Sequence, residues 1–168
     1  MWIDSSKSGD WQLSNKSHTY NLTVEWTGNT GAGTAKPGGY SKNHVVMAEG
    51  RPDILASSDP AFGGDVDRYN PEELLVAALS QCHMLWFLSR CAKHGIVVNA
   101  YRDEAVGTMA EHRDGGGEFT NVTLRPQITI ESEADPELLV RLHEESHHLC
   151  FIARSVNFPV EVDPTYTR

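Results

Sequence analysis

The stretch at residues 70–95 constrains the fold most strongly, because it carries both the start and the stop signals of one long helix. Asn70 is a favoured N-cap residue, Pro71 suits the first helical position, and Glu73 completes a capping box. Gly95 readily adopts the left-handed conformation that ends a helix. The interior is almost wholly apolar, and its polar interruptions include Ser80, Gln81, Cys82 and His83. These signals predict a buried central helix with a thiol near its middle.

The composition is that of a globular protein, and the charge disfavours two kinds of partner. The chain has 168 residues, of which 39% are hydrophobic, which suits a single domain over residues 1–168. Its net charge is −9, and it contains no run of basic residues. Nucleic acids and anionic membranes are bound through clustered Lys and Arg side chains. We therefore expect neither nucleic-acid binding nor membrane binding.

We expect a cytoplasmic protein with reduced thiols. The first residues lack the apolar segment of a signal peptide, and the central apolar run is too short and too polar in its middle to span a bilayer. The three cysteines, Cys82, Cys91 and Cys150, are odd in number and widely spaced, unlike a secreted disulfide framework. In a reducing compartment they are structural thiols, metal ligands or reactive thiols.

The chain before the central helix has the patterns of short strands joined by loops. Apolar and polar side chains alternate where a half-buried strand is predicted, and glycine and proline gather in the loops. The expected elements are a loosely ordered arm at 1–16, a half-buried strand at 20–27, a glycine-rich loop at 28–39, strands at 44–47 and 53–56, and a connecting loop at 57–68.

Two long strands are predicted after the central helix. The strand at 96–110 has a slip in its alternation near Arg102, which indicates a bulge. A turn at 114–117, rich in glycine, leads into the strand at 119–131. Pro126 cannot donate to a neighbouring strand, so this second strand lies at a sheet edge or has a break.

A second helix and a last strand complete the chain. Asp135 and Pro136 repeat the helix-start chemistry, and apolar residues then recur at helical spacing to about Arg154. Residues 156–162 alternate again, and a polar tail follows. This order predicts an α+β fold, with antiparallel sheet packed on a pair of helices.

Cys82 and Cys150 form the first candidate site. Free cysteines commonly act as small buried hydrophobic residues, and this structural role is one interpretation. A thiolate, however, needs polar surroundings, because a thiol in apolar surroundings has a raised pKa and stays inert. Polar neighbours of the two cysteines are Gln81, His83, His147 and His148.

The second candidate site is the sequence His143-Glu-Glu-Ser-His147, which satisfies the pattern of a zinc protease helix. His143 and His147 would face the same way, and Glu144 would serve as the base. A protease needs a third protein ligand, and Cys150 and Glu161 are not at a suitable spacing. We prefer a solvated helix flank for these histidines; a metal held by His143, His147 and Cys150, in a metal-binding protein or hydrolase, is the alternative.

Two motifs resemble those of the OsmC/Ohr family of thiol peroxidases. The first is NPEELLVAALSQC, which ends at Cys82, and the second is HHLC, which ends at Cys150 and is followed by the NFPV strand at 157–160. The likeness in element order covers roughly residues 18–164. It implies an intertwined homodimer whose sheets wrap around long central helices, and cysteine-based reduction of organic hydroperoxides.

The resemblance also implies the roles of individual residues. Cys82 matches the peroxidatic cysteine, Cys150 the resolving cysteine, and Glu72 the active-site glutamate. The Cys82 thiolate would attack the peroxide to leave a sulfenic acid, which would condense with Cys150 to a disulfide. A dithiol reductant, in this family typically a lipoylated protein, would restore the thiols. The chemistry requires no metal, flavin or haem.

The sequence departs from the family's pattern at the position of the active-site arginine. Lys42 lies where the arginine is expected, and Arg68 would fill the role from another direction. An arginine suits this role because it forms two parallel hydrogen bonds to an oxygen-containing group. If neither residue replaces it, the protein has drifted from peroxide chemistry; the alternative function is that of a non-catalytic dimer that binds a small ligand. An apolar pocket for an alkyl hydroperoxide would be lined by Met84, Trp86 and Phe87.

Helix geometry adds a condition for Glu72. On one straight helix it lies about 15 Å from Cys82 along the axis, so the two cannot meet within one chain. Either the helix is broken, or Glu72 comes from the antiparallel helix of a second subunit. Cys91 points away from Cys82, and we interpret it as structural.

Overall fold

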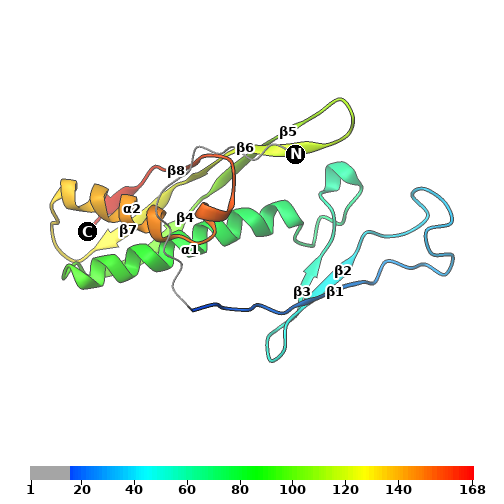
Figure 1. Cartoon of the computed structure of the whole chain (residues 1–168), viewed down its shortest axis with the longest axis horizontal. Coiled ribbons are helices and arrows are strands. Elements are labelled where there is room, and N and C mark those ends of the chain that lie inside the picture. The colour runs from blue at the N-terminus through cyan, green and yellow to red at the C-terminus, as the bar shows by residue number, and fades with distance from the viewer. Residues whose placement is uncertain (1–15) are drawn as a thin grey trace. The chain divides into compact units, whose positions relative to one another are not determined.

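The computed structural model describes residues 16–168, in which two α-helices, two short 3-10 helices and nine strands are found (Figure 1). The chain divides into two compact units, one ending at Ala56 and one beginning at Ser57. The single domain expected over residues 1–168 stays a prediction. The loosely ordered arm expected at residues 1–16 lies outside the described residues, apart from Lys16.

The first unit is a three-stranded antiparallel sheet. Its strands are β1 (Thr23–Trp26), β2 (His44–Met47) and β3 (Ile54–Ala56), with β2 in the centre. A loop joins β1 to β2 where the glycine-rich segment was predicted. Its two ends meet at Gly28, because the Ser41 N–H donates to the Gly28 carbonyl at 2.9 Å. A side chain at Gly28 would collide with the Ser41 backbone.

The prediction that β1 is half-buried was wrong. Its apolar side chains, and those just before it, are exposed: Tyr20 by 83%, Leu22 by 62%, Val24 by 59% and Trp26 by 42%. The described part of this unit contains no helix that would pack on the sheet and cover one face. The alternation therefore identified the strand but not its burial.

The second unit begins with a loop that contains the short 3-10 helix η1 (Pro60–Phe62), and then enters α1 (Pro71–Lys93). The predicted capping box is present, since Asn70 Oδ1 accepts from the Glu73 N–H at 2.7 Å and the Asn70 N–H donates to Glu73 Oε2 at 3.1 Å. Gly95 has a φ of 70°, the left-handed conformation expected after the helix. Both ends of the central helix are therefore set by local sequence.

Helix α1 is long and apolar enough to span a membrane by length and composition, so the sequence argument that it is too short was wrong. An 18-residue window in it has a mean hydropathy of 1.3, and 22% of that window is buried. One such helix is weak evidence, because core helices of soluble proteins have the same properties. The absence of membrane binding stays a prediction.

Two further three-stranded sheets follow α1. One has the order β4 (Val98–Asp103), β7 (Pro126–Ile130), β9 (Thr165–Thr167), and the other β5 (Val106–Glu111), β6 (Gly117–Leu124), β8 (Val160–Val162). Strands β8 and β9 join their sheets in parallel, so these sheets are mixed and not wholly antiparallel. Strand β9 lies in the segment expected to be a polar tail.

Each of the two predicted long strands is broken in the structure. The slip near Arg102 marks the end of β4, after which β5 continues in the other sheet. The break predicted at Pro126 also exists, with β6 before it and β7 after it. A hydrogen bond connects the two breaks, since the Arg125 N–H donates to Asp103 Oδ1 at 2.7 Å.

Helix α2 (Pro136–Leu149) starts as predicted, with Asp135 Oδ1 accepting from the Glu137 N–H at 3.0 Å. It ends before the predicted limit near Arg154, because Cys150 has the extended dihedral angles φ −70° and ψ 108°. The short 3-10 helix η2 (Ala153–Ser155) follows. Cys150 thereby becomes the C-cap residue of α2.

The core of the second unit consists of two clusters that share α1. Figure 1 shows α1 and α2 side by side in this unit, and Phe87, His83 and Arg90 of α1 contact α2. The larger cluster consists of Phe87, Cys91, Ile128, Ile130, Leu139 and Leu142; the smaller consists of Leu79, Val122 and Leu124. The α+β fold class is confirmed, with α1 as the common element of both clusters.

Candidate functional site

The structure brings Cys82 and Cys150 together. Cys82 lies near the middle of α1, and Cys150 is the C-cap residue of α2. The Cys82 side chain lies close enough to Cys150 to raise the pKa of the Cys150 thiol, and both residues are free thiols. The contact depends on α2 packing against α1, so two residues far apart in the sequence form one dithiol site.

The two thiols have different surroundings. Cys82 is partly exposed, whereas Cys150 is 1% exposed. Burial raises the pKa of Cys150 to about 11, the nearby Cys82 side chain raises it as well, and the Ala153 N–H acts in the opposite direction. This N–H donates to Cys150 Sγ at 3.3 Å. At neutral pH Cys150 is therefore a protonated thiol, while Cys82 is the thiol that solvent reaches.

An aromatic pair lies next to the dithiol. Trp86 is one turn after Cys82 on α1, and its ring meets that of Phe151 edge-to-face at 6.3 Å. The Arg90 guanidinium lies 5.5 Å from the centre of the Trp86 ring. Of the three residues predicted to line an apolar pocket, Phe87 is instead part of the buried core, and Met84 lines a separate cavity.

This cavity has a volume of about 960 Å³ and lies beside the N-terminal half of α1. Its lining combines apolar side chains with the carboxylates of Asp59, Glu72, Glu73, Asp103, Glu104 and Glu111. No Lys, Arg or His is among the described residues that line it. Glu72 thus faces an acidic, partly apolar cavity that does not include Cys82.

Glu72 and Cys82 do not meet within the chain. Helix α1 is continuous from Pro71 to Lys93, which excludes the broken helix considered above. The two residues remain about 15 Å apart along the axis. The contribution of Glu72 to a site at Cys82 stays a prediction that requires a second subunit.

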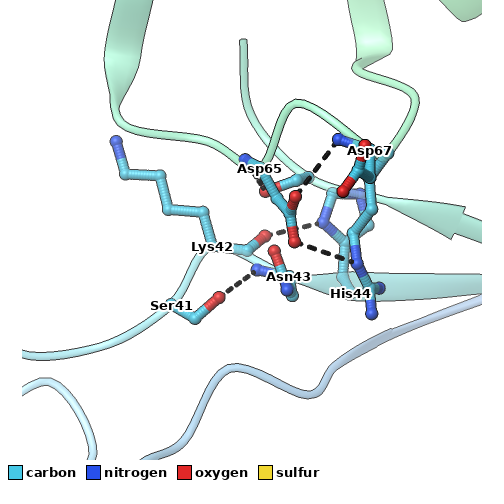
Figure 2. A network of polar contacts seen from close by, with 8 residues as sticks. Ser41, Lys42, Asn43, His44, Asp65 and Asp67 are labelled. Carbon is cyan, nitrogen blue, oxygen red and sulfur yellow. Dashed lines mark hydrogen bonds and ion pairs between the residues drawn. The ribbon is translucent and has the colours of Figure 1, made fainter. Parts of the chain in front are cut away.

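Figure 2 labels Lys42, one of the two candidates for the missing arginine, and Asp65, the ion-pair partner of the other candidate, Arg68. Lys42 is an exposed residue of the first unit, and its carbonyl oxygen lies 3.0 Å from Nδ1 of His44. Arg68 belongs to the second unit and pairs with Asp65, with its Nε 3.6 Å from Oδ2. Asp65 also accepts a hydrogen bond from the Asp67 N–H. The role of either residue in the site stays a prediction.

The interpretation of His143 as part of a solvated helix flank was wrong, whereas His147 is exposed as expected. His143 is 6% exposed, and its ring stacks on Phe87 with 4.0 Å between the ring centres. Its Nδ1 lies 2.9 Å from Nε2 of His83, and its Nε2 lies 2.8 Å from the Tyr166 hydroxyl. Both ring nitrogens are therefore engaged.

The metal-binding alternative loses its basis in this arrangement. Within residues 16–168, no group of three His, Cys, Asp or Glu side chains is placed to hold a metal ion. His143 and His147 also differ in exposure, since one is buried against Phe87 and the other faces solvent.

The buried histidine pair is the feature that sequence reasoning missed. Burial lowers the pKa of His83 to about 4, with a further contribution from the charge of His147, and burial lowers the pKa of His143 to about 3, with a contribution from His83. Both rings are neutral at neutral pH. The signal was present in the spacing of α1, because its buried residues recur every four positions: Leu79, His83, Phe87 and Cys91.

Cys91 is structural, as predicted from its position on the helix. It is 1% exposed within the larger core cluster, and burial raises its pKa to about 11.

Comparison with known proteins identifies the family. Residues 63–165 match the OsmC-like protein family. An OsmC-like protein of unknown function from Vibrio cholerae O1 biovar eltor str. N16961 is 34% identical, with a TM-score of 0.80, over 89% of this chain and 100% of that chain. No curated protein matches the chain.

Two structures described as organic hydroperoxide resistance proteins share the fold. The protein from Elizabethkingia anophelis is 20% identical, with a TM-score of 0.65, over 92% of this chain and 99% of that chain. The protein from Legionella pneumophila is 15% identical, with a TM-score of 0.63, over 90% of this chain and 100% of that chain. The match to the family over most of the second unit, together with the likeness to the Vibrio protein, shows that this chain belongs to the OsmC/Ohr family.

Proposed function

We propose that this protein is a thiol-dependent peroxidase that reduces organic hydroperoxides to alcohols. The observation that carries the proposal is the contact between the Cys82 and Cys150 side chains, which two different helices supply. Membership of the OsmC/Ohr family supports redox chemistry, and two proteins of the same fold are described as organic hydroperoxide resistance proteins.

The first two steps use the different surroundings of the thiols. The partly exposed Cys82, as a thiolate, attacks the terminal oxygen of the hydroperoxide; the O–O bond breaks, the alkoxide takes a proton, and Cys82 becomes a sulfenic acid. The Cys150 sulfur then attacks the Cys82 sulfur, and the sulfenic oxygen leaves as water with the Cys150 proton. Cys150 carries that proton at neutral pH, because burial raises its pKa to about 11, and it must lose the proton as its sulfur attacks.

A small dithiol, such as the lipoyl group of a partner protein, completes the cycle. It is oxidised to its own disulfide as Cys82 and Cys150 are reduced. The proposed cycle uses no metal, flavin or haem.

We further propose that the active form is a homodimer in which Glu72 acts on the partner's dithiol. The support is geometric, since α1 is unbroken and separates Glu72 from Cys82 within one chain. Lys42 or Arg68 would supply the cation that binds the peroxide.

A second candidate function is the binding of a small ligand without catalysis. The cavity beside α1 favours it, because about 960 Å³ lies in the size range of small-molecule sites and its lining combines apolar with acidic side chains. The two functions differ in one observable, since a binding protein would keep Cys82 and Cys150 reduced in excess organic hydroperoxide.

Steady-state turnover tests the peroxidase proposal. Purified protein should consume cumene hydroperoxide with a small dithiol as the electron donor, and Cys82→Ser should abolish the consumption. The matched control is Cys91→Ser, which removes a core thiol and should retain turnover. Unchanged turnover in Cys82→Ser would exclude this mechanism.

A further inference from the structure

Helices α1 and α2 pack against each other in antiparallel orientation. Phe87 stacks on His143, His83 lies against the same ring, and Cys82 meets Cys150. From one contact to the next, the residue numbers therefore fall on α1 and rise on α2. The dithiol is one contact of an antiparallel helix pair, and its geometry depends on how that pair is aligned.

The contact between His83 and His143 is the one between these helices whose strength depends on direction. The His83 and His143 ring planes are parallel to within 1°, and His83 Nε2 lies 2.9 Å from His143 Nδ1. His83 is 1% exposed and His143 6% exposed. Dispersion contacts such as the Phe87 stack tolerate small shifts, whereas a hydrogen bond weakens steeply with distance and angle. The geometry of the buried pair is therefore more sensitive to the axial position of α2 than the Phe87 stack is.

His83 depends on this one contact. Its other ring nitrogen, Nδ1, is buried without a hydrogen-bond partner among the described residues. If α2 shifted, both nitrogens of His83 would be buried and unsatisfied, which is costly in a protein interior. His143 has a second partner in Tyr166, which anchors it to β9. The pair therefore resists a slip of α2 from both sides.

We propose that His83 and His143 are positioning residues that hold α2 in the alignment at which Cys150 meets Cys82. The inference rests on the dithiol site of the proposed function. Cys150 is the C-cap residue, so a shift of α2 by one residue would move it about 1.5 Å along the axis. A disulfide tolerates a narrow range of distances and angles between its two side chains. Loss of alignment would therefore make disulfide closure less favourable without removing either thiol.

Disulfide closure is measured without peroxide, in a buffer of reduced and oxidised glutathione. One molecule of oxidised glutathione takes two electrons and two protons from Cys82 and Cys150, and yields the protein disulfide and two reduced glutathione molecules. The equilibrium gives the effective concentration of one thiol toward the other. This quantity exists whether or not the protein is a peroxidase, so failure of the inference and failure of the proposed function are distinguishable.

The sharpest test replaces each histidine with asparagine in one variant and with glutamine in another. An Asn amide lies near the place of Nδ1 of a histidine, and a Gln amide near the place of Nε2. At position 143, His143→Asn keeps a partner for His83 and should keep the effective concentration, whereas His143→Gln should lower it roughly 10- to 100-fold. At position 83 the order is reversed: His83→Gln should keep closure and His83→Asn should lose it.

A control and a folding readout complete the test. Glu145→Gln weakens a different contact between the helices, the 3.9 Å ion pair with Arg90, and should leave closure unchanged. Circular dichroism checks that each variant folds. The reversed order at the two positions supports the inference, because a general loss of stability would not reverse it. The same order at both positions, no difference between Asn and Gln, or failure of all four variants to fold would overturn it.

Discussion

At the scale of single residues, the unequal surroundings of Cys82 and Cys150 suit them to different steps of the proposed cycle. Cys82 is partly exposed and would meet the peroxide in the proposed cycle, whereas Cys150 is buried and keeps its proton because burial raises its pKa to about 11. The two cysteines differ in position, since Cys150 is the C-cap residue of α2 and Cys82 lies within α1.

Removal of the second thiol should separate the two steps. In Cys150→Ser, the Cys82 sulfenic acid should still form with one equivalent of organic hydroperoxide, and it should persist because no resolving thiol is present. Trapping with a sulfenic-acid reagent and mass spectrometry measures this species. The wild-type protein is the control and should trap far less. If Cys150→Ser yields no trapped Cys82, the order of the two steps is wrong.

The sequence pointed to both thiols of the candidate site but not to the burial of the two histidines beside them. Cys82 and Cys150 each end a short sequence motif, so the sequence alone is enough to recognise them. The burial of His143 instead depends on contacts with Phe87, His83 and Tyr166, which come from other elements. A histidine on a polar helix face gives no local sign of such partners.

At the scale of elements, local signals placed the helices and tertiary pairing decided the sheets. Asn70 and Gly95 set the ends of α1 through their own backbone and side-chain chemistry, as predicted. Strand β9 was missed because its polar residues pair in parallel with β7, a contact between residues far apart in the sequence. The sheet change at Arg102 was visible only as a slip, since alternation does not say which sheet a strand joins.

The contact between α1 and α2 should make stability depend on pH. Burial lowers the pKa of His83 to about 4 and that of His143 to about 3, from 6.5 in the unfolded chain. Below 6.5 the unfolded state binds more protons than the folded state. The free energy of unfolding should therefore fall as the pH drops from 6.5 toward 4, by up to about 1.4 kcal/mol per pH unit for each ring.

Urea unfolding at a series of pH values through this window measures the slope. His143→Gln removes one of the two titrating rings and should flatten the dependence. The matched control is His94→Gln, which changes an exposed histidine at the end of α1 and should preserve the wild-type slope. A stability that stays constant down to pH 4, or an equal slope in His143→Gln, would contradict the assignment of buried neutral rings.

At the scale of the whole molecule, two features favour assembly with a second copy. Glu72 and Cys82 are separated along one unbroken helix, and 22% of the most apolar window of α1 is buried within the chain. A partner helix antiparallel to α1 would cover apolar surface and bring one subunit's Glu72 to the other's Cys82. The resemblance implied the homodimer and helix geometry implied that Glu72 comes from the second subunit; both stay predictions.

Mixed dimers test whether Glu72 acts across subunits. Glu72→Gln and Cys82→Ser should each be inactive or strongly impaired alone, but unfolding and refolding them together should restore about a quarter of the wild-type turnover. A mixed dimer of this kind holds one complete site, with Cys82 from one subunit and Glu72 from the other. Refolding each variant by itself is the control, and the absence of any recovery in the mixture would place Glu72 outside the site.

The most direct test of the central claim is the covalent state of the chain after one equivalent of cumene hydroperoxide, measured by mass spectrometry of peptides from non-reduced protein. Cys91→Ser provides a background in which Cys82 and Cys150 are the remaining thiols. The account predicts a chain lighter by two hydrogen atoms, a linked peptide that joins Cys82 to Cys150, and one molecule of alcohol per chain. Two unlinked thiols and unconsumed hydroperoxide would contradict it.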